Sequence, residues 1–277
     1  MLLTLLIWVL LSKHLLEDLY AEEVLRGDCV NGPQSGCKVT LETPNETSVT
    51  GRSNLPLEFV HIPKTGGSAI EKAAARVGIS WGACHFHHDL EKEMNCPKPD
   101  LNASNITKML PFRREPVLWH IPPNYWKPNP FETVKTFAVV RNPFTRTLSA
   151  YHCPIDGYTE KDRDDPEVMN SVIKYYITRK GHWYTRYMPQ SSFVFDLVWE
   201  KKIDHVLKYE NLTAEFRELM ETYNLTDVVL EEEQRYNTPR NRTLTLRDLT
   251  NETIELIREH FREDFIRLGY PLTLPLD

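Results

Sequence analysis

Phe59–Ser68 has the sequence Phe-Val-His-Ile-Pro-Lys-Thr-Gly-Gly-Ser, and we expect the fold to be organised around it. The mostly apolar run Leu57–Ile62 predicts a short buried strand that ends at Pro63. The spacing of apolar residues over Ser68–Val77 then predicts a helix. A strand, a glycine-containing turn and a helix in this order indicate an α/β fold.

The turn in this motif has the composition of an anion-binding site. Its adjacent glycines, Gly66 and Gly67, let backbone N–H groups approach a phosphate, and the N-terminus of the next helix favours negative charge. Lys64 adds a mobile cation, and Ser68 would cap the helix or bind the same anion. The spacing differs from the Walker pattern, in which lysine follows the second glycine directly. The simpler alternative is a strand-to-helix turn that uses glycine only for its geometry.

A second motif follows about eighty residues later. Val134–Val140 predicts a strand, and Pro143 supports a helix that begins at about Asn142. Arg141 would therefore lie at the carboxyl end of a central strand, where α/β sheets bind ligands. Ser149 lies two turns along the helix, and an arginine with a hydroxyl suits a second phosphate. The alternative is a surface arginine and an ordinary helical serine.

Four further elements are predicted from apolar patterning. We expect strands at Ile79–Phe86 and Ile203–Tyr209, and helices at Pro166–Arg179 and Thr250–Leu268. Gly269 directly after the last helix is a typical C-terminal cap.

Chain length and charge limit the possible functions. The 277 residues suffice for one α/β domain or two smaller ones. The net charge of −6 argues against a nucleic-acid partner, because the surface as a whole does not attract polyanions. Any anion site must therefore be a local basic pocket.

The N-terminal part is predicted to lie outside this domain. Residues 1–20 begin with an apolar stretch that is too short to span a bilayer, which needs about 20 residues. They suit a signal peptide or a signal anchor, and a buried helix is the alternative. Residues 21–54 are polar and predict a stem or linker, so the domain would cover residues 55–277.

Acceptor triplets for N-glycosylation favour the secretory route. Seven Asn-X-Ser/Thr triplets occur, beginning at Asn45, Asn102, Asn105, Asn211, Asn224, Asn241 and Asn251. The five cysteines are compatible with that compartment. Cys29 with Cys37 and Cys84 with Cys96 are plausible disulfides that would leave Cys153 free, although sequence alone does not determine the connectivity.

Two groups of histidines are candidates for chemistry. His120 lies between apolar residues and two prolines, which suits either a buried structural histidine or a positioned base. His85, His87 and His88 form a polar cluster without a recognised metal-ligand spacing, so we expect surface histidines and no metal.

Taken together, the motifs at Phe59–Ser68 and Val140–Tyr151 resemble those of the membrane-associated carbohydrate sulfotransferase family. The resemblance extends over about Leu55–Pro271, with support from Leu207–Leu212 and Asp264–Tyr270. It implies a three-layer fold like that of P-loop kinases, with a central parallel sheet flanked by helices.

The resemblance also implies a cofactor and its binding residues. The donor would be 3′-phosphoadenosine 5′-phosphosulfate, without a metal. The 5′-phosphosulfate would be held by the first motif, namely Pro63, Lys64, Thr65, Gly66, Gly67 and Ser68. The 3′-phosphate would be held by Arg141 and Ser149.

The implied reaction is in-line transfer of a sulfuryl group to a hydroxyl of a glycan. Lys64 would neutralise the charge that develops on the bridging oxygen. A histidine or glutamate would take the acceptor proton. We predict that His120 is this base, and the rivals are Glu71 and the histidines of residues 85–88.

Two other functions remain open at this point. A nucleotide kinase or NTPase would prefer ATP with magnesium, and the missing Walker lysine argues against it. A non-catalytic glycan-binding relative would keep the fold without nucleotide affinity. For the leading function we expect a protein of the Golgi lumen, held at the membrane by its N-terminal segment, or alternatively a secreted one.

Overall fold

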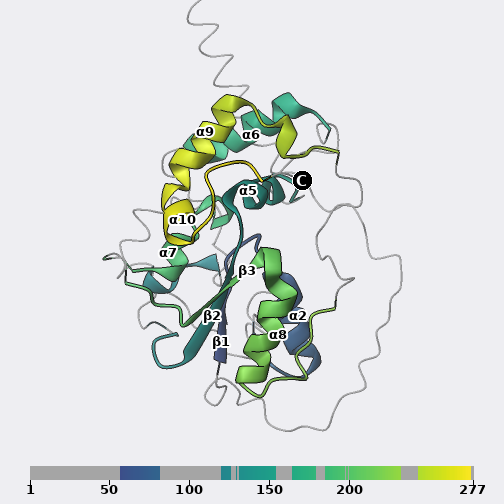
Figure 1. Ribbon diagram of the computed structural model, residues 1–277, viewed down its shortest axis with the longest axis vertical. Coiled ribbons are helices and arrows are strands. Elements are labelled where there is room, and N and C mark those ends of the chain that lie inside the picture. Colours follow the sequence, from purple (N-terminus) through teal and green to yellow (C-terminus); the bar gives the residue numbers. More distant parts are fainter. Residues whose placement is uncertain are drawn as a thin grey trace, which may run out of the picture.

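The fold is built on a parallel β-sheet (Figure 1). The structure, a computed structural model, describes residues 57–81, 120–125, 129, 131–153, 164–178, 185–196, 198, 200–231 and 243–275. In these residues the sheet has three strands, β1 (Leu57–Val60), β2 (Lys135–Val140) and β3 (His205–Lys208), in the order β1-β2-β3. Both neighbouring pairs are parallel and helices flank the sheet, which confirms the predicted α/β fold.

The strand register brings the ends of all three strands to one edge. Val60 pairs with Ala138, and Val140 pairs with Lys208. The turn after β1, Arg141 after β2 and Tyr209 after β3 therefore emerge at the same edge of the sheet. This edge is where open α/β sheets bind ligands.

One face of the sheet is covered by α2 (Gly67–Arg76) and α8 (Leu212–Thr222), which lie side by side in Figure 1. Side chains alternate along the strands, so Phe137 and Val139 of β2 both point to this face. The buried cluster between sheet and helices comprises Leu57, Phe59, Ile70, Ala73, Ala74, Trp81, Phe137, Val139, Leu207, Phe216, Leu219, Met220 and Val228.

The other face of the sheet packs against α7 (Ser191–Val194) and neighbouring loops. Ala138 and Val140 of β2 point this way, and the short 3₁₀ helix η2 (Pro123–Tyr125) lies close to α7. This cluster comprises Val60, Ile62, Phe131, Ala138, Val140, Met188, Phe193, Val194, Ile203 and Leu268.

A third group of helices lies beyond the carboxyl ends of the strands (Figure 1). It contains α5 (Pro143–Tyr151), α6 (Pro166–Thr178), α9 (Asn251–His260) and α10 (Arg262–Arg267). Their buried cluster comprises Phe144, Tyr151, Met169, Ile173, Leu244, Leu246, Leu249, Ile254, Ile257, Phe261 and Phe265. The 3₁₀ helices η3 (Thr185–Tyr187), η4 (Tyr209–Asn211) and η5 (Leu246–Asp248) complete the described elements.

The predicted helix Thr250–Leu268 is wrong in one respect, because it is divided into α9 and α10 at Phe261. Phe261 leaves helical geometry with φ −101° and ψ 23°, and its ring is buried in the third cluster, which stabilises the break. The predicted cap is confirmed. Gly269 has φ +68°, and the N–H of Tyr270 donates to the carbonyl of Phe265 at 2.9 Å.

The predicted strand Ile79–Phe86 is wrong for the residues that the structure describes. Ile79 donates its N–H to the carbonyl of Ala74 at 2.9 Å, which closes the end of α2 and removes this donor from any sheet. Trp81 follows in a turn and donates its indole N–H to the carbonyl of Leu57 at 3.0 Å. Residues 82–86 lie outside the described part of the chain.

Several sequence predictions concern residues that the structure does not describe. They include the N-terminal segment and stem, the histidines of residues 85–88, and four of the five cysteines. Cys153 is buried and forms no disulfide, as predicted. Among the described residues, no helix is both long enough and apolar enough to cross a bilayer.

Candidate functional site

The turn after β1 enters α2 through left-handed backbone. Lys64 has φ +70°, and Gly66, the N-cap of α2, has φ +93°. A side chain is strained at such a φ, so glycine is favoured at the N-cap. Ser68 is already the second residue of α2, which makes the prediction that it caps the helix wrong. Its hydroxyl remains at the N-terminal end of the helix.

The start of α2 has the properties of an anion site. Ala69 donates its N–H to the carbonyl of Gly66 at 3.0 Å, so the N–H groups of Gly67 and Ser68 precede the first bond of the helix. The first turn contains no acidic residue that would neutralise the positive end of the helix dipole. The turn therefore directs positive potential to the ligand-binding edge of the sheet.

The carbonyl oxygens of residues 62–64 are held by three donors. The hydroxyl of Thr65 donates to the first at 2.8 Å, Arg146 Nε to the second at 2.9 Å and Arg141 Nη1 to the third at 3.4 Å. Both arginines belong to the second motif, so the structure joins the two predicted motifs directly. Carbonyl oxygens engaged in this way are also kept from repelling an anion at the turn.

Arg141 is fixed from several sides. Its Nε donates to Oγ1 of Thr145 at 3.0 Å, and its guanidinium carbon lies 4.1 Å from the centroid of the Tyr209 ring. The same ring borders Gly66, where an added Cβ would lie 3.1 Å from Tyr209 Cε2. Ser149 is buried two turns further along α5. The predicted position of Arg141 after the strand and the predicted start of the helix at about Asn142 are confirmed, because α5 begins at Pro143 with Asn142 as its N-cap.

Two buried residues of opposite charge, Arg146 and Asp264, lie behind this edge, and their burial was not predicted from the sequence. Arg146 is fully buried and donates from Nη1 to the carbonyl of Met188 at 2.8 Å. Burial lowers its pKa to about 10, which leaves it protonated at neutral pH. Asp264 is also fully buried, and burial raises its pKa while the charge of Arg146 acts in the opposite direction.

A buried histidine–glutamate pair supports the turn from inside. His61 Nδ1 lies 2.6 Å from Glu71 Oε1, and both side chains are buried. A Cβ on Gly67 would lie 2.5 Å from His61 Nε2, so the histidine ring occupies the space of a side chain at that position. Gly67 is thus required by its neighbour His61.

The ring of His120 packs edge-on against His61, with 4.7 Å between ring centroids and an interplanar angle of 72°. His120 is buried, and the ring of His61 lies between this predicted base and Gly67. Of the sequence-predicted rivals, Glu71 belongs to the same buried group, whereas the histidines of residues 85–88 lie outside the described chain. Within the described residues, His, Cys, Asp and Glu form no group of three that could hold a metal.

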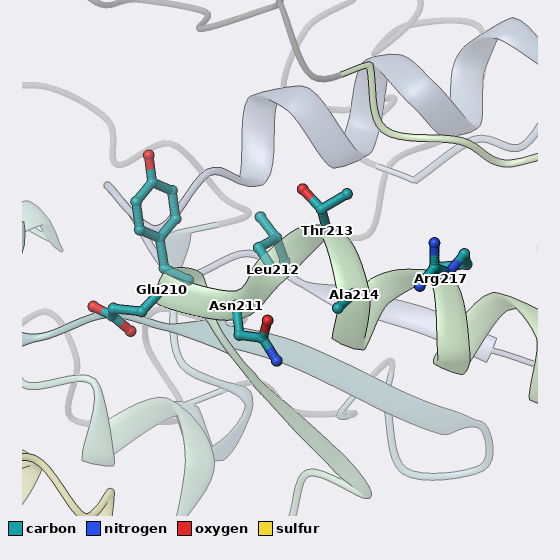
Figure 2. Close-up of a pocket in the computed structure, with 7 residues that line it drawn as sticks. Glu210, Asn211, Leu212, Thr213, Ala214 and Arg217 are labelled. Atoms are coloured by element: carbon teal, nitrogen blue, oxygen red, sulfur yellow. The ribbon is translucent and has the colours of Figure 1, made fainter.

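An open pocket of about 290 Å³ adjoins this region at the start of α8. Figure 2 shows Leu212 and Thr213 projecting to one side of the chain and Asn211 to the other, with Arg217 one turn further along. The pocket is lined by Tyr209, Glu210, Asn211, Leu212, Thr213, Ala214 and Arg217. It shares Tyr209 with the surroundings of Arg141.

Comparison with known proteins identifies the family. A family model described as "Sulfotransferase family" matches residues 52–271. This range includes both motifs and the segments that contact them. No curated protein and no solved structure matches the chain. The match spans most of the 277 residues, and the chain therefore belongs to the sulfotransferase family.

Proposed function

We propose that this sulfotransferase uses 3′-phosphoadenosine 5′-phosphosulfate as donor and a hydroxyl of a glycan as acceptor. The observation that carries the proposal is the hydrogen bond from Arg141 Nη1 to the carbonyl of Lys64 at 3.4 Å. It joins two cationic motifs at the carboxyl ends of adjacent parallel strands. A donor with phosphate groups at both its 5′ and 3′ positions requires two neighbouring anion sites, and this contact supports that arrangement.

The residues present fit this donor. The turn from Pro63 to Ser68 offers backbone N–H groups at a helix N-terminus, and Lys64 adds a charge at its half-buried position. The hydroxyl of Thr65 donates within the turn, so Thr65 would contribute its N–H. Arg141 and Ser149 would bind the 3′-phosphate, the arginine through its planar guanidinium.

The donor supplies a sulfuryl group on a phosphate leaving group. In an in-line displacement, a new S–O bond to the acceptor hydroxyl forms as the bridging S–O bond breaks. Negative charge then gathers on the bridging oxygen, and the ammonium group of Lys64 would neutralise it. Lys64 is suited to this role because its left-handed backbone belongs to the turn that would hold the phosphate.

The acceptor proton would pass to Nε2 or Nδ1 of His120. The support is its location, since His120 packs on His61 and His61 contacts Gly67 of the turn. An imidazole has an ordinary pKa near the pH at which a base works best, and a positioned base contributes roughly a hundred- to ten-thousand-fold. His61 and Glu71 are bonded to each other and would fix His120 from behind.

The glycan acceptor and the Golgi lumen belong to the same proposal. Support comes from the apolar N-terminal segment, which would anchor the protein to the membrane, and from the seven acceptor triplets. Three of these triplets begin at residues that the structure describes, Asn211, Asn224 and Asn251, and all three asparagines are exposed. Exposed asparagines are accessible to a glycosylating enzyme.

The test is transfer of radiolabelled sulfate from the donor to a panel of glycans by the full chain. We expect labelled product with at least one glycan class, and loss of that product in Lys64→Ala. Lys72→Ala is the matched control, because Lys72 is an exposed lysine of α2. Labelling of no glycan by folded protein, or equal labelling by Lys64→Ala and Lys72→Ala, would overturn the proposal.

A further inference from the structure

We propose that Gln190 and Asp264 are positioning residues that hold Arg141 in its binding conformation and thereby set the selectivity for a 3′-phosphorylated nucleotide. The inference rests on the proposed function, in which Arg141 binds the 3′-phosphate. Neither residue lies in the two sequence motifs, and Gln190 precedes α7, nearly fifty residues after Arg141.

The side chain of Gln190 forms hydrogen bonds with both the backbone N–H and the backbone carbonyl of Arg141. Its Oε1 accepts the N–H of Arg141 at 2.8 Å, and its Nε2 donates to the carbonyl of Arg141 at 2.8 Å. This pairing resembles that of a neighbouring strand, and it begins where β2 ends at Val140. The side chain of Gln190 is fully buried, so water does not compete for these two bonds.

Asp264 of α10 in turn fixes Gln190. Its Oδ2 accepts the backbone N–H of Gln190 at 2.8 Å and the side-chain Nε2 of Gln190 at 3.3 Å. Its Oδ1 accepts the N–H of Ser191 at 2.7 Å. The carboxylate determines which end of the Gln190 amide is the donor, because only the NH₂ group can face it. Arg146 supplies a nearby positive charge that compensates for burial of the carboxylate.

The contacts form a continuous path from the C-terminal helix to the anion site. Asp264 holds Gln190, Gln190 holds the backbone of Arg141, and the side chain of Arg141 reaches the carbonyl of Lys64. A backbone fixed on both sides limits the directions that the guanidinium can take. We call the two hydrogen bonds from the Gln190 side chain to the Arg141 backbone the clamp. Displacement of a binding group by about 1 Å can lower the strength of its interaction about a hundredfold, so removal of the clamp should weaken the contact with the 3′-phosphate specifically.

The test compares the affinities of adenosine 3′,5′-bisphosphate and adenosine 5′-phosphate for the full chain by calorimetry. The ratio of the two affinities isolates the 3′-phosphate contact, whereas partial unfolding lowers both affinities together. Gln190→Met keeps the side-chain volume but removes both bonds to Arg141. We expect it to reduce the ratio at least about tenfold. Asp264→Asn retains the bonds between Gln190 and Arg141 but weakens the hydrogen bonds by which residue 264 holds Gln190. We expect it to reduce the affinity ratio by less than Gln190→Met does.

Asn170→Ala is the control, because Asn170, like Gln190, is a buried amide whose side chain forms three hydrogen bonds, and in Asn170 all three join backbone groups. Its Nδ2 donates to the carbonyls of Pro166 and Asp248, and its Oδ1 accepts the N–H of Thr250. We expect this variant to lose stability and keep the affinity ratio.

The possible results separate the two proposals. A wild-type chain that does not prefer the bisphosphate would contradict the proposed function itself. A wild-type preference that persists unchanged in folded Gln190→Met and Asp264→Asn would contradict only the positioning role. A ratio that falls equally in Asn170→Ala would also contradict it, because the effect would then be one of general stability.

Discussion

A substitution at Gly67 tests the packing of the turn after β1, because the ring of His61 occupies the space in which a side chain at position 67 would lie. A Cβ on Gly67 would lie 2.5 Å from His61 Nε2 and 2.7 Å from both Cδ2 and Cε1. The ring has little freedom to withdraw, since its Nδ1 is hydrogen-bonded to buried Glu71 at 2.6 Å and it packs in a T-shaped arrangement with the ring of His120. Gly67→Ala should therefore force a rearrangement at the start of α2.

The expected magnitude follows from two opposed effects. Overpacking of a well-filled interior costs about 1–3 kcal/mol. Alanine in place of glycine favours a helix by up to about 1 kcal/mol, and Gly67 is the first residue of α2. In the wild-type background Gly67→Ala should then lower the free energy of unfolding by about 0–3 kcal/mol. In a His61→Ala background the obstruction is gone, and the same substitution should be neutral or stabilising by up to about 1 kcal/mol.

The assay is urea denaturation of the four members of this double-mutant cycle, followed by circular dichroism. The cycle subtracts the cost of removing the ring itself, and we expect an interaction free energy of about 1–3 kcal/mol. Gly78→Ala is the control, because Gly78 has φ +78° and nothing within 4 Å of an added Cβ. It should cost about 1–2 kcal/mol of backbone strain equally in both backgrounds. An additive result for Gly67→Ala would refute the packing of His61 against the turn.

Three other substitutions test the proposed chemistry and the electrostatics. Lys64→Ala should keep the unfolding midpoint and lower turnover at least about a hundredfold, measured with labelled donor; near-normal turnover would remove Lys64 from catalysis. His120→Ala should abolish transfer without changing the calorimetric affinity for adenosine 3′,5′-bisphosphate, and retained transfer would assign the base to another group. Burial lowers the pKa of His260 below its ordinary 6.5, although its contact with the Tyr187 carbonyl at 2.8 Å opposes the shift. As the pH is lowered, the unfolded chain therefore binds a proton at this histidine before the folded protein does. The free energy of unfolding should then decrease at pH values below about 6.5, by at most about 1.4 kcal/mol per pH unit. If urea titrations of a His260→Gln variant gave the same dependence of this free energy on pH as the wild type, the assignment to His260 would be refuted.

The features that follow from local sequence were predictable. The strand before Arg141 is a continuous apolar run, and Pro143 marks the first helical residue after it, so the place of Arg141 at the strand end could be inferred. The turn after β1 was also predictable from its two glycines, and Gly66 does take a left-handed backbone. The left-handed backbone of Lys64 was not predictable, because lysine does not favour it. These features depend on residues that are close in the chain.

The partners of the site residues could not be predicted, because they are determined by the way distant segments pack. Gln190 contacts Arg141 from nearly fifty residues away in the chain, and Asp264 contacts Gln190 from more than seventy residues further on. The structural role of His61 could not be predicted from its own sequence context either. It depends on a hydrogen bond to Glu71, ten residues later in α2, and on the space left by Gly67. The division of the last helix at Phe261 likewise reflects tertiary packing of an aromatic ring, not a local helix breaker.

The central claim is that the two motifs bind one nucleotide that carries both a 5′ and a 3′ anion. The most direct measurement is calorimetric titration of the full chain with adenosine 3′,5′-bisphosphate and, separately, with ATP and magnesium. We predict micromolar binding of the bisphosphate, loss of that binding in Arg141→Ala, and weaker binding of ATP. Preference for ATP with magnesium, or bisphosphate binding that survives Arg141→Ala unchanged, would contradict the account.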